Sequence, residues 1–507
     1  MALKGTTRIE LTNVKTGEVE VIEKDNLVTN AVSDILQINP GGILFKNYSN
    51  IYDGEIGSSF DSKFLPICRN LIGGILLYEN PLDEDPDKYF APQSNKIIGY
   101  SSGDVNPGSE TMRGSLNQTE SGILEDDSGY RYVFDFETSQ ANGTISSLGL
   151  TSTFGGAGGY GSRYNPTSEY RKPLLCVYDY STGIFSGQYK NAPSALAWGN
   201  IVSIDYENDT GYFAYMSAAK TITVGRMRMN LRNVGLRNYY PAYRTVVDTQ
   251  IISTTNFAAT AYTSNYFYGT LIDGGDGYIW GFQHQGNAAG NSSGKATVLW
   301  IKISKADWSF EEGTWSIDAT LDYFGKVGSF SSPNYAAQET RAAILDGKLY
   351  VRRYNANNYY GDIYEIPLNN VTDVKLYVAD ATVMDNATSD SVSRLNIING
   401  RITAYNHYLN GDKSKYVQLR VPGAGTNAAA SGRMCMIRCG KPGLTYGPFI
   451  FSFGTYAYPY SSAPTYTYYT TIYLQMCFLA TINNLPTPVE KTADKTMKIT
   501  YILREES

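Results

Sequence analysis

The stretch "ILDGKLYVRRY" (344–354) contains the pattern that decides the fold. A short apolar run leads into an Asp-Gly pair, and an alternating run with an aromatic residue follows. Such a pair between two alternating runs favours a tight hairpin, because its turn positions take positive φ. The pattern recurs in "LAWGNIVSIDY" (196–206), "IDGGDGYIWGF" (272–282) and "IINGRITAYNHY" (397–408), and more loosely in "YGPFIFSFG" (446–454).

The spacing of these hairpins indicates a repeat. Their glycines, at positions 199, 277, 347, 400 and 447, are 78, 70, 53 and 47 residues apart. The later gaps approach the roughly 40–50 residues of one propeller blade. Radial closure of four-stranded blades leaves few open sheet edges. We therefore expect a β-propeller-like domain of five or six degenerate blades over residues 166–480, with a Greek-key sandwich or barrel as the alternative.

The first 165 residues predict a separate β domain. A hairpin is expected over 8–23, with its turn at residues 15–17, and a short helix over 26–37. In "YRYVFDFE" (130–137) the aromatic residues alternate with charged ones, which indicates a half-buried strand. We expect a β-sandwich-like fold. The glycine-rich "TFGGAGGYGS" (153–162) is expected to be a junction between domains, since no helix start follows it.

The end of the chain predicts a return to this first domain. In "MKITYIL" (497–503) apolar and polar residues alternate, but no hairpin partner lies beside it in the sequence. We expect residues 481–507 to add their strand to the sheet of residues 1–165. The propeller would then be an insertion with two connections to its base.

Composition excludes some partners. The 507 residues have a formal net charge of −6, so there is no basic surplus to neutralise nucleic-acid phosphates. The longest apolar run, "LIGGILLY" (71–78), is far shorter than the roughly 20 residues of a membrane span. The N-terminus lacks the apolar stretch of a secretory signal. We expect synthesis in a cytoplasm, no membrane insertion and no nucleic-acid partner.

The sequence predicts no cofactor. Five cysteines and two histidines lack zinc-ligand spacing, so buried thiols are the better interpretation. The acidic "LDEDPDKY" (82–89) offers carboxylates for calcium without the EF-hand spacing.

Catalytic motifs are also weak. "SFEEGTW" (309–315) departs from the sialidase box and is interpreted as a turn pinned by a packed tryptophan. Asp135 and Glu137 share a strand face, where we expect solvated surface rather than an acid pair. An arginine trio for a substrate carboxylate could be assembled from Arg226, Arg341, Arg352, Arg353 and Arg401. We expect no enzyme, and a glycan hydrolase remains an alternative.

A carbohydrate-binding site needs fewer specific residues than a catalytic site. Aromatic faces offer a large contact area and lose little side-chain conformational entropy on binding. The propeller region places several tyrosines in loop-like settings, although each could instead pack between blades. The candidates are Tyr262, Tyr266, Tyr268, Tyr359, Tyr360, Tyr456, Tyr458 and Tyr460. The run from Tyr466 onward is expected to form the last strands of the propeller instead.

Three segments outside the propeller region resemble a known class of proteins. They are "TRIELTNVKTGEVEVIEKDNLVTNA" (7–31), "RGSLNQTESGILEDDSGYRYVFDFETSQANGTISSLGLT" (113–151) and "LATINNLPTPVEKTADKTMKITYIL" (479–503). These segments are similar to tail proteins of bacteriophages of Gram-positive, Firmicutes-like hosts. The resemblance covers roughly residues 1–165 and 480–507 and includes no catalytic motif.

The resemblance implies a virion structural protein of the tail tip, baseplate or fibre type. A shared attachment part would carry a variable part that meets the host, with other tail proteins and a host-surface glycan or protein as partners. It also implies a homo-oligomer, with a trimer favoured, located in the virion tail after assembly in the host cytoplasm. A purely structural or decoration protein that recognises nothing is the remaining alternative.

Overall fold

The described part of the chain is nearly all β-strand. The computed structural model describes residues 3–37, 72–103, 105–106, 111–152, 173–179, 201–205, 207–208, 210–228, 245–257, 266–285, 294–328, 339–354, 362–377, 395–398, 400–404, 407–409, 416–418, 444–457, 466–475 and 477–505. One helix, α1 (Asn30–Gln37), lies among these residues. This confirms the all-β class with one short helix. The glycine-rich junction at 153–162 lies outside the described residues.

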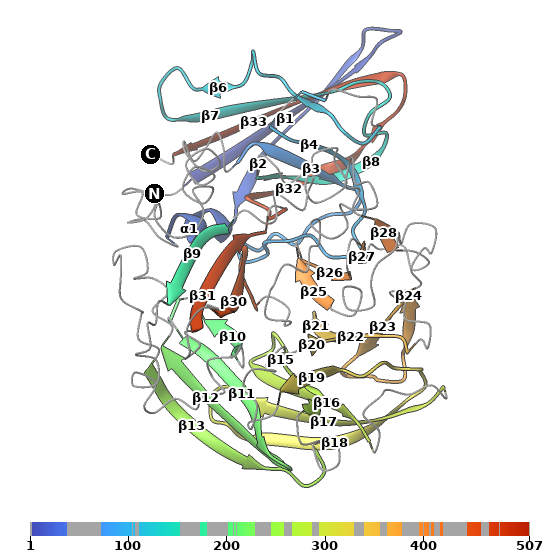
Figure 1. Cartoon of the computed structure of the whole chain (residues 1–507). Coiled ribbons are helices and arrows are strands. Elements are labelled where there is room, and N and C mark those ends of the chain that lie inside the picture. Colours follow the sequence, from blue (N-terminus) through green and yellow to red (C-terminus); the bar gives the residue numbers. More distant parts are fainter. Residues whose placement is uncertain are drawn as a thin grey trace.

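Ten strands form one sheet, which we call the base sheet. Its order is β4-β3-β8-β32-β2-β1-β33-β7-β5, with β6 also paired to β7. The sheet curls until its two halves face each other, so the expected sandwich-like layers belong to a single, nearly closed sheet (Figure 1). The strands are β1 (Leu3–Asn13), β2 (Val19–Val28), β3 (Gly74–Tyr78), β4 (Ile97–Ser101), β5 (Ser115–Leu116), β6 (Gly122–Ile123), β7 (Gly129–Phe136), β8 (Gly143–Thr151), β32 (Thr481–Lys491) and β33 (Lys495–Glu505).

The C-terminal strand lies in the middle of this sheet. β33 pairs with β1 on one side and with β7 on the other, antiparallel in both cases. The side chains of β33 alternate as the sequence predicts: one face is buried in the core, and the other is partly exposed and mostly polar. The buried side chains are Met497, Ile499, Tyr501 and Leu503, and they pack with Tyr132, Phe134 and Phe136 of β7.

The predicted helix over 26–37 begins too early. Asn26 to Val28 continue β2, and Leu27 and Val28 pair with β32. The Thr29 hydroxyl donates to the Leu479 carbonyl at 2.6 Å, so it anchors the chain to the segment just before β32 instead of capping the helix. A tertiary strand partner has overridden the local apolar stripe.

Five four-stranded sheets follow the base sheet and form the blades of a propeller-like domain. A small three-stranded sheet, β14-β19-β20, lies between the first and third blades in the sequence. Blade 1 consists of β10 (Ile201–Asp205), β11 (Thr210–Ala218), β12 (Thr221–Arg228) and β13 (Thr245–Ser253). Blade 2 consists of β15 (Thr270–Asp273), β16 (Tyr278–His284), β17 (Ala296–Ser304) and β18 (Phe310–Ile317). Blade 3 consists of β21 (Ala342–Leu345), β22 (Lys348–Arg352), β23 (Ile363–Pro367) and β24 (Lys375–Tyr377). Blade 4 consists of β25 (Leu395–Ile398), β26 (Arg401–Ala404), β27 (His407–Leu409) and β28 (Tyr416–Gln418). Blade 5 consists of β29 (Leu444–Tyr446), β30 (Phe449–Ala457), β31 (Tyr466–Leu474) and β9 (Pro173–Asp179). The small sheet consists of β14 (Tyr266–Tyr268), β19 (Gly325–Gly328) and β20 (Glu339–Thr340).

The first strand of each blade lies innermost. These strands contact one another in the order β29, β10, β15, β21 and β25, and the blades follow one another around a centre (Figure 1). In four blades the hairpin after the innermost strand turns at a predicted glycine: Gly277, Gly347, Gly400 and Gly447 have φ of 86°, 70°, 66° and 50°. In blade 1 the corresponding hairpin turns at 207–208. Gly199 therefore precedes the innermost strand and is not its turn.

We call the end of the propeller that carries these turns the near end, because the propeller's first strand in the chain, β9, begins there and its last, β31, ends there. β31 finishes beside Phe449, and its neighbour β9 begins at the same level, where Tyr473 pairs with Pro173. The outermost strand of the last blade thus comes from the first propeller segment of the chain. At the opposite, far end, the second strand of each blade ends and the third begins.

One segment of the base reaches across to the near end. Gln93 lies between β3 and β4, and its side chain donates to Tyr350 Oη at 3.2 Å in blade 3. It also accepts from the Ile402 N–H at 3.3 Å in blade 4. A Cβ atom added to Gly400 would lie 2.4 Å from Phe90 Cβ, so this turn can approach the base only without a side chain.

We predict that truncating the central strand of the base sheet destabilises the protein strongly. Ile499→Ala should lower the free energy of unfolding by about 2–5 kcal/mol, because Ile499 is fully buried and the cavity cannot fill. Thr500→Ala, on the polar face of the same strand, should change it by less than about 0.5 kcal/mol. Urea titration of the full chain measures both, and equal effects would contradict this placement of β33.

Candidate ligand-binding end of the propeller

Four of the eight candidate tyrosines share one feature of chain order. Tyr266 and Tyr268 lie in β14 and Tyr456 in β30, although their side chains are outside the described part. Tyr262, Tyr359, Tyr360, Tyr458 and Tyr460 lie outside the described residues. Tyr359 and Tyr360 stand in the sequence between the end of β22 and the start of β23, and Tyr458 and Tyr460 between β30 and β31. These strand ends are all at the far end of the propeller.

The far end also carries a compact ionic cluster around Asp322. Arg341, just before the innermost strand of blade 3, places Nη1 2.8 Å from Asp322 Oδ2. Arg352, at the end of β22, places Nη1 3.7 Å from the same oxygen. The Arg341 guanidinium also lies 3.8 Å from the centroid of the Tyr323 ring. Two of the five candidate arginines are therefore brought together.

Burial gives this cluster a structural role. The side chains of Asp322 and Arg352 are only 8% and 1% exposed, and that of Arg341 is 12% exposed. Removing one partner of such a pair leaves a charge in a low-dielectric site, which is costly. Only the Tyr323 and Arg341 side of the cluster is partly open to solvent. A ligand at the far end would meet a guanidinium stacked on an aromatic ring.

His284 completes the cluster from blade 2. Its Nε2 lies 2.9 Å from the Asp322 carbonyl oxygen, and its ring lies 5.0 Å from that of Phe324. Burial lowers the pKa of His284 below its ordinary value, against the weaker opposing effect of the Asp322 carbonyl. The neutral imidazole therefore donates from Nε2 to this carbonyl.

The other candidate arginines are dispersed. Arg226 forms an ion pair with Asp248 within blade 1. Arg353 lies 3.2 Å from Asp362, with 43% of its side chain exposed. Arg401 donates to the Gln93 carbonyl at 3.2 Å, at the near end. Among the described residues, the five candidate arginines therefore do not converge as a trio that could bind one substrate carboxylate.

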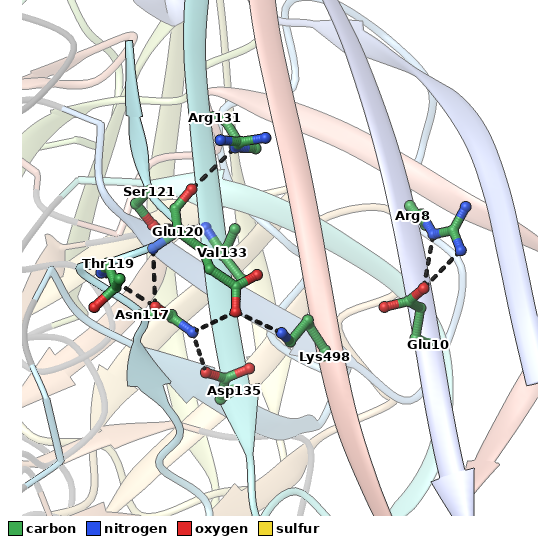
Figure 2. Close-up of polar contacts among 10 residues, drawn as sticks. All are labelled: Arg8, Glu10, Asn117, Thr119, Glu120, Ser121, Arg131, Val133, Asp135 and Lys498. Atoms are coloured by element: carbon green, nitrogen blue, oxygen red, sulfur yellow. Dashed lines mark hydrogen bonds and ion pairs between the residues drawn. The ribbon is translucent and has the colours of Figure 1, made fainter. Parts of the chain in front are cut away.

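Neither candidate acid motif makes a catalytic pair. Asp135 accepts from Asn117 Nδ2 at 2.9 Å on the polar face of the base sheet (Figure 2). Glu137 is exposed after the end of β7. The "SFEEGTW" stretch is not a turn pinned by a tryptophan. Residues 310–315 belong to β18, and the turn lies before them at 305–307. Trp315 does pack, against Trp280 and Trp300 of the neighbouring strands.

The described residues contain no group of three or more histidine, cysteine, aspartate or glutamate side chains arranged to hold a metal ion. In the acidic stretch at 82–89, Asp87 Oδ1 accepts from Asn30 Nδ2 at 2.7 Å. Within the same described part, no helix has the length and apolar character needed to cross a membrane.

Sequence reasoning missed Asp322, Tyr323 and His284. The only available signal was the scarcity of histidine, since the chain has just two. The cluster joins residues from β16, β22 and the segments before β19 and β21. No local pattern connects them, because propeller closure alone brings them together.

Comparisons with known proteins add little. No protein-family description matches the chain, and no curated protein does. Among solved structures, the chain is similar to the exo-beta-1,3-galactanase of Phanerochaete chrysosporium, which contains galactose, at 7% identity and a TM-score of 0.19. The match covers 60% of this chain and 95% of that chain. A TM-score of this size carries no argument about fold or activity.

We predict that Asp322 stabilises the far end. Asp322→Asn should lower the free energy of unfolding by about 3 kcal/mol, because two buried guanidinium groups lose their shared carboxylate. Asp373→Asn removes a carboxylate of an exposed pair, 3.9 Å from Lys375, and should cost less than about 0.5 kcal/mol. Thermal denaturation compares the two variants, and a small loss for Asp322→Asn would show that the cluster is not held by this carboxylate.

We also predict a pH dependence from His284. Its pKa is lower in the folded protein, so the unfolded chain binds a proton that the folded protein does not as pH falls below about 6.5. The stability is full above that pH and declines during acidification. His284→Gln should flatten the dependence of Tm on pH between about 7.5 and 5.5. Equal slopes in wild type and His284→Gln would contradict the prediction.

Proposed function

We propose that this protein is a structural component of a bacteriophage tail that presents the far end of its propeller to the host surface. The base sheet is the attachment part, which other tail proteins bind, and the protein acts as a homo-oligomer without catalysis. The observation that carries the proposal is the asymmetry of the propeller. The start of β9, the end of β31 and the segment with Gln93 all lie at the near end.

The composition of the two ends supports different roles. At the near end, turns with small residues lie against the base; the turn at Gly400, for example, packs against Phe90 of the base. The strand ends that flank the candidate tyrosines lie at the far end, as do Arg341 and its stacked Tyr323. Aromatic faces and a guanidinium are the groups that bind sugar C–H patches and hydroxyls. A host-surface glycan is therefore the ligand class that we favour.

Adsorption competition tests this proposal. Purified protein, incubated with host cells before infection, should reduce phage adsorption in a saturable way. The double variant Tyr359→Ala with Tyr360→Ala should compete about tenfold less well, since losing aromatic anchors costs 1 kcal/mol or more at binding sites.

A matched control separates recognition from folding. Ile123→Ser changes a side chain that is 68% exposed on the base sheet, and it should compete like wild type. The absence of competition by wild-type protein at saturating concentration would refute host binding. Protein that still co-purifies with the virion tail in that case would support the purely structural role.

A further inference from the structure

The base sheet has an open edge along β2. This strand pairs with β1 from Val19 to Asn26, but it pairs with β32 only at Leu27 and Val28. Among the described residues, no strand pairs with the outer edge of β2 between Val19 and Asn26. The Lys24 side chain contacts the same chain, donating to the Asn484 carbonyl at 2.6 Å and lying 3.2 Å from Glu84, so the open part of the edge is Val19 to Glu23. Unpaired strand edges are templates for another chain, and proteins usually cover or blunt them.

The register shows which backbone groups face outward. The Asn13 N–H donates to the Glu18 carbonyl at 2.9 Å, so this pair is hydrogen-bonded. Hydrogen-bonded and non-hydrogen-bonded pairs alternate along antiparallel strands. Val19, Val21 and Glu23 are opposite Thr12, Glu10 and Arg8 in non-hydrogen-bonded pairs. Their N–H and C=O groups therefore point away from β1, toward the open edge.

Exposed valines mark the same edge. Val19 and Val21 are 55% and 44% exposed, and Val14 in the adjoining turn is 55% exposed. The neighbours on this face are polar and already paired with each other. Arg8 lies 2.6 Å from Glu10 and 2.7 Å from Glu23, and Figure 2 shows the first of these contacts. The exposed valines, in contrast, have no apolar partner among the described residues on this face.

We propose that β2 pairs antiparallel with β2 of a second copy of this chain, about a two-fold axis at Val21. The two Val21 residues then face each other in a hydrogen-bonded pair, with Val19 of each copy diagonal to Val21 of the other. The continuous sheet joins two base domains and buries the exposed valines. The inference holds whatever the far end of the propeller binds.

The charges along β2 are compatible with a second copy in this register. About Val21, Glu18 of one copy is opposite Lys24 of the other, twice by symmetry. Lys24 also lies 3.2 Å from Glu84 of its own chain, so Glu18 would join an existing ion pair. Glu23 faces Val19 with its charge already balanced by Arg8. A register about Glu20 would place two Glu20 carboxylates directly opposite, which is destabilising. A register about Ile22 would place the exposed Val19 opposite Asp25. The Val21 register alone joins valine to valine and has no like charges opposite.

Solution mass and crosslinking test the pairing with the full chain. Wild-type protein should sediment as a dimer at micromolar concentration. Val21→Pro should raise the dimer dissociation constant about tenfold or more, because it removes the outward N–H from both copies. Its Tm should remain near the wild-type value, since this N–H makes no bond to β1. Val21→Lys, which places two charges at the axis, should weaken the dimer even if the proline variant folds poorly.

A crosslink fixes the register. The two Cα atoms of residue 21 would be about 5.5 Å apart, whereas those of residue 19 would be about 14 Å apart. Val21→Cys should therefore add an inter-chain crosslink with a short bis-maleimide to whatever the five native cysteines give in wild type, while Val19→Cys should add none. Val247→Lys, at a residue 58% exposed on the outer strand of blade 1, should leave the dimer intact. A monomer or trimer for wild type, an unchanged dimer for both Val21→Pro and Val21→Lys, or loss of the dimer in Val247→Lys would overturn the proposal.

Discussion

The pairing of β33 between β1 and β7 is the constraint on which the rest of the structure depends. It places residues from the two ends of the chain in one antiparallel ladder, where Ile9 is opposite Ile499 and Ile499 is opposite Phe134. The propeller must then leave from the base sheet and return to it. Its two connections enter neighbouring strands of one blade, β9 and β31, at the same end. The near end is therefore committed to the base, and the far end is left for other contacts.

Two connections alone would permit a hinge, and the contacts at the near end oppose one. The hydrophobic core of the base sheet is continuous with residues of blades 1 and 5, through Phe213 and Phe449. Blade 3 adds a buried polar network in which Glu365 accepts from Tyr377 at 2.8 Å and from Lys348 at 2.9 Å. These donors hold the pKa of Glu365 below its ordinary value despite burial, which acts in the opposite direction. Because Tyr350 joins this network to Gln93 of the base, rotation of the propeller would break satisfied buried hydrogen bonds.

Local patterns predicted the features that depend on neighbouring residues. Alternation identified the buried face of β33, and the glycine turns identified four of the five blade hairpins, because positive φ at those positions requires no tertiary information. Features that depend on distant partners were not predictable. Asn26 to Val28 remain extended because β32 is beside them, and β9 completes a blade whose other strands are more than 260 residues further along the chain. The Asp322 cluster depends on the same closure, while the candidate tyrosines at 359 and 360 lie outside the described residues.

Apart from the buried Asp322 cluster, the division between the two ends also separates the apolar cores of the propeller from the end proposed to meet the host. Blades 1 and 2 share an apolar core that includes Val224 and Leu299, blades 2 and 3 share another, and blades 3 and 4 share a third. Each core lies between strands and does not require the connections at the far end. Loops on such a scaffold tolerate substitution and insertion better than the strands that support them. A protein that must keep its attachment part while its contact surface changes needs this arrangement, because changes at the far end then leave both the base sheet and the blade cores intact.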